Sequence, residues 1–291
     1  MPRRSAKTAQ PTLPSALRGL RVVNLAINAP GPAAAARLAD LGATVVKIEP
    51  PGGDPLRKFC PAWYRELSRG QKIVRLNLKT AAGRARLDRF LAPAALLVTA
   101  QRRAALERLG LGWRRLHAKF PALCQVALVG YPAPRQNVPG HDLTYQAEAG
   151  LLAPPGLPPT LWLDLASAER MVGAALGLLL SRQRSGGGAY AEVAIADTAR
   201  AFAAPLRHRL TAPGGLLGGG SACYNLYPAS DGWVAVAALE PRFWQRLRDE
   251  LKIPSGGRAR LAAAFRARTA RQWERWAFER DLPIAAVLRL V

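Results

Sequence analysis

Short apolar runs rich in β-branched residues alternate with helix-favouring segments, and this alternation constrains the fold more than any other feature. Strands are expected at residues 20–26, 43–49, 94–100, 124–130 and 189–195. Helices are expected at residues 33–41, 81–91, 104–120 and 165–182, with another from Asp197. Strands joined through helices run parallel in one sheet. The alternation therefore predicts an α/β fold with a Rossmann-like, doubly wound, mostly parallel sheet covered on both faces.

A second, smaller unit is expected after a glycine-rich stretch that follows residue 205. In this unit the sequence predicts a hairpin turn at Asp231-Gly232, a strand over residues 233–239, and helices after Pro241 and around residues 271–280. The first residues carry three prolines and lack the apolar run of a signal peptide. We expect a disordered tail over 1–15, a large domain with linker helices over 16–205, and a small α+β domain over 206–291.

The net charge of +23 is unusual and comes mainly from arginine, which makes up 35 of the 42 basic residues. Guanidinium groups bind phosphate, so this charge suits nucleic acid or a small molecule that carries a nucleotide. The arginines are scattered from Arg3 to Arg289 and form no single basic run interleaved with aromatic residues. We therefore expect a solvated arginine-rich surface and no dedicated nucleic-acid site.

The cysteine and histidine content is low and points to neither a disulfide framework nor a metal site. There are three residues of each type, with no closely spaced pair of the kind that binds zinc. No stretch reaches the roughly 20 apolar residues that a membrane span needs. We expect a cytoplasmic protein without a bound metal and without a membrane segment.

Seven segments along the chain carry a shared pattern: residues 17–23, 38–49, 76–80, 107–112, 139–147, 231–232 and 239–244. In this order they resemble the class III CoA-transferase family, which includes the formyl-CoA transferases and the α-methylacyl-CoA racemases. The segment Gly140-His141-Asp142 and the acid Glu240 are similar to the racemase branch of that family.

The resemblance implies chemistry at the acyl group of a coenzyme A thioester. In the racemases, residues matching Asp164 and His141 lie on opposite sides of the α-carbon, where one removes the proton and the other returns it. Residues matching Asp142 and Glu240 would then orient the histidine. In the transferases, the residue matching Asp164 attacks the thioester and forms an acyl-aspartyl anhydride, a covalent intermediate that divides one difficult step into easier ones.

The resemblance also implies how coenzyme A would be held. Lys72, Arg102 and Arg108 are expected to bind its phosphates, and the loop Gly218-Gly219-Gly220 is expected to cover the acyl site, where small residues permit motion. Coenzyme A would be part of the substrate, with no permanently bound cofactor. Three family positions differ here, since Pro50, Gln71 and Gln101 stand in place of an arginine, a lysine and an aromatic residue.

Family members form homodimers of interlocked rings, in which the chain returns after the small domain to complete the large one. We expect a homodimer here, but this sequence stops at Val291 without the returning segment. Interlocking is therefore left open at this point.

Three functions remain open from the residues alone. The first is racemase-like proton transfer, the second is CoA transfer between carboxylic acids, and the third is a degenerate protein that binds coenzyme A or nucleic acid without catalysis. Each site residue also has a simpler interpretation. Asp164 resembles a helix N-cap, Glu240 would favour the positive end of the next helix, and the glycine run resembles a linker.

Overall fold

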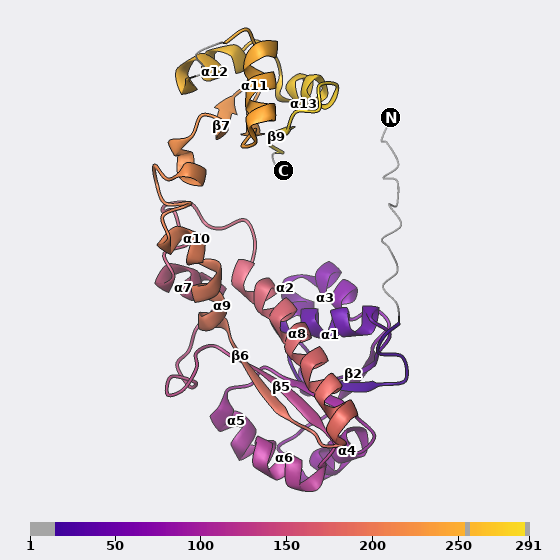
Figure 1. Cartoon of the computed structure of the whole chain (residues 1–291). Coiled ribbons are helices and arrows are strands. Elements are labelled where there is room, and N and C mark those ends of the chain that lie inside the picture. Colours follow the sequence, from indigo (N-terminus) through magenta and orange to yellow (C-terminus); the bar gives the residue numbers. More distant parts are fainter. Residues whose placement is uncertain (1–14, 254–256, 289–291) are drawn as a thin grey trace. The chain divides into compact units, whose positions relative to one another are not determined.

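A computed structural model describes residues 15–253 and 257–288 of the chain (Figure 1). The tail expected over residues 1–15 lies outside the described residues except for Ser15. The chain divides into two compact units, residues 1–202 and 203–291.

The first unit is built on a parallel six-stranded sheet with the strand order β3-β2-β1-β4-β5-β6. This order confirms the predicted doubly wound α/β fold, because the chain starts at the sheet centre and builds outward in both directions. The strands are β1 (Arg21–Asn24), β2 (Thr44–Glu49), β3 (Lys72–Arg75), β4 (Leu96–Thr99), β5 (Cys124–Val129) and β6 (Tyr190–Ala194).

Helices cover both faces of this sheet, and successive strand residues feed opposite cores. Val22 packs into the core beneath α1 (Pro30–Asp40), α3 (Pro61–Leu67) and α8 (Trp162–Ser185), whereas Val23 packs into the core beneath the helices of the other face. Those helices are α4 (Ala81–Leu91), α5 (Arg103–Arg108) and α6 (Trp113–Lys119). The remaining helices of this unit are α2 (Leu56–Phe59), α7 (Asp142–Glu148) and α9 (Ile195–Phe202).

Two predicted helices differ from the observed ones. The helix expected over residues 104–120 is broken into α5 and α6 at a turn where Gly110 has a φ of 72°, a left-handed conformation that ends a helix. The helix expected from residue 165 begins three residues earlier, at Trp162. Asp164 therefore lies inside the first turn of α8 rather than ahead of it.

The second unit contains an antiparallel sheet with the order β7-β8-β9, formed by β7 (Tyr224–Pro228), β8 (Trp233–Ala237) and β9 (Ile284–Ala286). The predicted hairpin at Asp231-Gly232 joins the first two strands. The core contains a cluster of aromatic residues, with Phe265 stacked on Tyr227 and packed edge-on against Trp273. The helices are α10 (Ala204–Arg207), α11 (Pro241–Glu250), α12 (Arg258–Phe265) and α13 (Ala270–Phe278).

The described helices include none with the length and apolar character needed to cross a bilayer.

Candidate active site

A cavity of about 270 Å³ lies at the carboxyl ends of β1, β4 and β5 in the first unit. Loops that follow parallel strands meet at this edge, which is where ligands bind in open α/β sheets. Three residues predicted from the sequence line the cavity together: Arg102 from the loop after β4, His141 at the start of α7, and Asp164 from α8.

Asp164 has the electrostatic character of a residue that exchanges protons near neutral pH. Burial, and to a lesser extent the nearby negative charge of Asp142, raises the pKa of its carboxyl from the ordinary value of 3.8 to about 7. The first turn of a helix favours a carboxylate, but that effect is worth only about 0.3–1 kcal/mol. The burial cost therefore outweighs the helix dipole at this position.

Asp142 is hydrogen-bonded to the start of α8, and its expected role in orienting His141 stays a prediction. Its Oδ1 accepts the backbone N–H groups of Leu163 at 2.8 Å and Asp164 at 3.0 Å, and its Oδ2 accepts from Gln146. Leu161, the N-cap residue of α8, has no side chain that can cap the helix, so Asp142 satisfies these donors from another helix. The sequence-based interpretation that made Asp164 the cap therefore named the wrong aspartate.

His141 occupies the N-cap position of α7 and carries an exposed side chain at the cavity. The Thr144 hydroxyl holds its backbone in place, accepting the His141 N–H at 3.0 Å and donating to the His141 carbonyl at 2.8 Å. The backbone around the imidazole is thus fixed by α7 itself.

Tyr145 also lines the cavity, although no role was predicted for it from the sequence. Its side chain is buried, and its hydroxyl fills the space where Cβ atoms on Gly130 and Gly140 would lie, at 2.2 and 2.5 Å. Burial, helped by the charges of Tyr131 and Asp164, raises the pKa of this phenol to about 12. Tyr145 is therefore a neutral hydrogen-bond donor at physiological pH. Gly130 and Gly140 were the only sequence features that could have pointed to Tyr145, but that both lie against its phenol is seen only in the fold.

The three residues predicted to bind phosphate lie in different places. Arg102 lines the cavity described above, whereas Arg108 lines a separate hollow of about 280 Å³ between α4 and α6. Lys72 is exposed at the start of the edge strand β3, with its Nζ 5.9 Å from the centre of the Phe90 ring. The hollow around Arg108 is also lined by Arg84, Arg115 and Lys119, and by Asp88, whose carboxylate pairs with Lys119 at 2.5 Å.

Glu240 and the three glycines belong to the second unit. Glu240 is exposed and immediately precedes α11, where its carbonyl accepts the N–H groups of Phe243 and Trp244 but its side chain makes no cap hydrogen bond. A Cβ on Gly218 would lie 1.8 Å from the Ala212 carbonyl oxygen, and Gly219 has a φ of 89°. The turn therefore needs these glycines for its own packing, which makes it a folded turn instead of a free linker. The expected roles of Glu240 and the turn at the acyl group stay predictions.

Within the described residues, no group of three or more His, Cys, Asp or Glu side chains is arranged to hold a metal ion.

The chain is similar to proteins that act on coenzyme A thioesters. The model of CoA-transferase family III matches residues 17–290. The succinyl-CoA–D-citramalate CoA-transferase of Chloroflexus aurantiacus is 30% identical over 286 residues, covering 90% of this chain and 71% of that protein. The α-methylacyl-CoA racemase of Homo sapiens is 32% identical over 262 residues, covering 82% of this chain and 66% of that protein.

A solved structure shares the fold over most of the chain. The crystal structure of a hypothetical protein from Mycobacterium tuberculosis superimposes with a TM-score of 0.82 at 28% sequence identity. The superposition covers 94% of this chain and 84% of that one.

Proposed function

Because the chain belongs to CoA-transferase family III, a family of enzymes that includes CoA-transferases and acyl-CoA racemases, we propose that it moves the α-proton of an acyl-CoA thioester in the manner of an α-methylacyl-CoA racemase. The observation that carries this proposal is the raised pKa of Asp164, about 7, in a cavity that His141 also lines. A carboxyl of this kind is present in both protonation states near neutral pH, as a group that alternately takes and returns a proton must be.

The cavity also supplies donors for the charge that develops during such a reaction. Removal of the α-proton turns the thioester into an enolate, whose oxygen carries negative charge. The protonated phenol of Tyr145 and the guanidinium of Arg102 line the same cavity. Donors fixed in advance at such an oxygen lower the barrier because they need no reorganisation when the charge appears.

The distribution of cations supports a binding mode for the nucleotide end of the thioester. Arg108 lies with Arg84 and Arg115 in a hollow apart from the Asp164 cavity, where Lys119 is paired with Asp88. Clustered guanidinium groups of this type bind phosphate groups. We assign the phosphates of coenzyme A to this hollow. Lys72 is not among its lining residues, so we give it no part in this binding mode.

CoA transfer is the second candidate, favoured by the similarity to CoA-transferases over 90% of the chain. Here the Asp164 carboxylate attacks the thioester carbonyl carbon, the carbon–sulfur bond breaks, and coenzyme A leaves as a thiolate. The acyl group remains on Asp164 as an anhydride. The same side chain thus serves both reactions, as a base in one and as a nucleophile in the other.

Exchange of the α-proton in deuterated water separates these functions. With 2-methylbutanoyl-CoA as the probe, we expect the native chain to incorporate deuterium and Asp164→Asn to lose at least about a hundredfold of this rate. The matched control is Glu169→Gln, an exposed residue of α8 that pairs with Arg37 and lies outside the cavity. Full exchange in Asp164→Asn would refute the racemase assignment. Hydroxylamine added during turnover should convert Asp164 to a hydroxamate only if the anhydride forms.

A further inference from the structure

The loop between β1 and α1, residues 25–29, forms part of the wall of the Asp164 cavity and contains a strained residue. Ile27 and Asn28 line the cavity, as does Pro30 at the start of α1. Asn28 has a φ of 66°, in the left-handed region, which is uncommon for residues other than glycine although asparagine adopts it more readily than most. A residue in such a conformation persists only where its surroundings hold it there.

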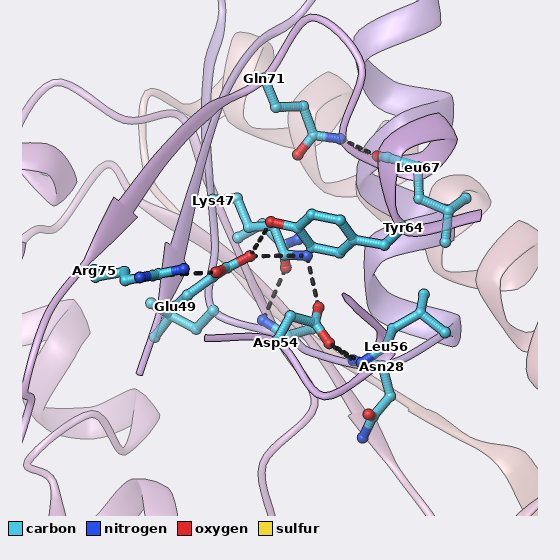
Figure 2. A network of polar contacts seen from close by, with 12 residues as sticks. Asn28, Lys47, Glu49, Asp54, Leu56, Tyr64, Leu67, Gln71 and Arg75 are labelled. Carbon is cyan, nitrogen blue, oxygen red and sulfur yellow. Dashed lines mark hydrogen bonds and ion pairs between the residues drawn. The ribbon is translucent and has the colours of Figure 1, made fainter. Parts of the chain in front are cut away.

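Asp54, which follows β2, provides that hold. Its Oδ1 accepts the backbone N–H of Asn28 at 3.0 Å and that of Leu56 at 2.9 Å (Figure 2). The residue is only 2% exposed, so these hydrogen bonds are shielded from water. One carboxylate therefore ties the loop after β1 to the turn that begins α2.

Lys47 holds Asp54 from the other side. Its Nζ lies 2.6 Å from Asp54 Oδ2 and 3.4 Å from Glu49 Oε1, and the lysine is 1% exposed (Figure 2). The two oxygens of Asp54 thus have different partners, because Oδ1 accepts the two backbone N–H groups and Oδ2 pairs with the ammonium group of Lys47. Burying these charges carries a desolvation cost, and a buried ion pair is weak support for stability by itself.

The polar network has a second branch that does not reach the loop. Glu49 accepts a hydrogen bond from the Tyr64 hydroxyl at 2.7 Å, and both side chains are buried. This branch joins β2 to α3, whereas the Asp54 branch joins β2 to the cavity wall. The two branches share Lys47. A substitution in the Glu49 branch therefore serves as the control for one in the Asp54 branch, because only the Asp54 branch reaches the cavity wall.

We infer that Asp54 and Lys47 are positioning residues, whose buried ion pair fixes the Asn28 turn against the cavity containing Asp164 and His141 and so sets where the acyl group lies. This inference rests on the proposed function, since it assigns the acyl group to that cavity. It makes no demand on the hollow around Arg108, where the nucleotide end is assigned.

Asp54→Asn is the primary test, with Tyr64→Phe as the matched control. Asparagine has the size of aspartate but only one acceptor oxygen, so it cannot serve both the backbone groups and Lys47. With 2-methylbutanoyl-CoA we expect kcat for α-proton exchange to fall about tenfold or more in Asp54→Asn, which is the size of effect that loss of a charge-assisted hydrogen bond produces. KM should stay within about twofold of the native value. Tyr64→Phe removes one hydrogen bond of the same network and should leave kcat within about twofold.

Amide hydrogen exchange, measured by mass spectrometry without substrate, tests the loop independently of activity. Peptides covering residues 25–33 should exchange faster in Asp54→Asn than in the native chain and remain unchanged in Tyr64→Phe, with a peptide from β5 as the internal reference. An unchanged loop in Asp54→Asn, or an equal increase in both variants, would overturn the inference. If Asp54→Asn does not fold, Lys47→Gln, which removes the positive charge of the ion pair with Asp54, should show the same pattern. An unchanged loop in this variant would equally overturn the inference. A native chain without α-proton exchange would count against the proposed function, while the amide measurement would still decide the role of Asp54.

Discussion

The burial of the Asp164 carboxyl implies that the native side chain destabilises the fold at neutral pH, and that Asp164→Asn will relieve this cost. The pKa of the carboxyl rises from 3.8 in its ordinary state to about 7 in the folded chain. Each tenfold change in proton affinity corresponds to about 1.4 kcal/mol, so the ionised group carries a cost of about 4 kcal/mol.

The cost depends on pH in a defined direction. The folded state binds the proton more tightly than the unfolded state, so stability is lost as pH rises from about 4 through about 7. The expected cost is about 1–2 kcal/mol at pH 5 and about 4 kcal/mol at pH 8. Asparagine carries no charge at any of these values, so any cost of burying its amide is the same throughout.

Urea denaturation of the native chain and of Asp164→Asn, at pH values between about 5 and 8, measures this difference directly. The stability of the variant relative to the native chain should increase by roughly 2–3 kcal/mol across that range. Glu169→Gln, on the exposed face of α8, should show no comparable trend, because exposed ion pairs contribute little. A stability difference for Asp164→Asn that stays constant with pH would refute the assignment of a raised pKa.

Two further predictions concern the neighbours of Asp164 and the binding of coenzyme A. Asp142→Asn keeps an oxygen for the backbone of α8 but removes the negative charge, so the pKa of Asp164 should fall. The acidic limb of the pH profile of kcat/KM should then move to lower pH, and an unmoved limb would contradict the charge effect. Arg108→Ala should raise KM for the thioester roughly 5- to 30-fold through loss of a phosphate contact, while Lys72→Ala should change KM less than about twofold. Equal effects in the two variants would contradict the assignment of the phosphates to the hollow around Arg108.

The strand and helix alternation was enough to predict the large sheet, because buried parallel strands show as continuous apolar runs. The edge strand β3 was missed, since in Lys72–Arg75 only Val74 is buried and the charged residues at its ends hide the pattern. The strand β9 was missed because it has only three residues. Local pattern thus succeeds where the strand sequence is a continuous apolar run. It also found β6 at the other edge of the large sheet, whose only charged residue is Glu192, but it failed for β3 and β9.

The candidate site was predictable only in part, because its geometry depends on contacts between distant segments. The resemblance supplied Asp164 and His141, but the hydrogen bonds from Asp142 to α8 span 21 and 22 residues and have no local signature. Gln101 stands where the family has an aromatic residue, yet its amide donates to the Leu25 carbonyl at 2.6 Å and adds a tether to the loop after β1. Gln101, which in the sequence indicated only the loss of an aromatic residue, therefore forms a hydrogen bond in the fold that its position alone did not predict.

The cap that Asp142 places on α8 makes the location of the Asp164 carboxyl independent of the chain segment that connects α7 to α8. Because the hydrogen bonds bridge α7 and α8 directly, the residues between Gly150 and Leu161 can change in length or composition while Asp164 keeps its place. That connection contains Pro154 and Pro155 and forms no regular element. It is thus a natural site for loop exchange, in which this connection is varied while Asp164 stays fixed.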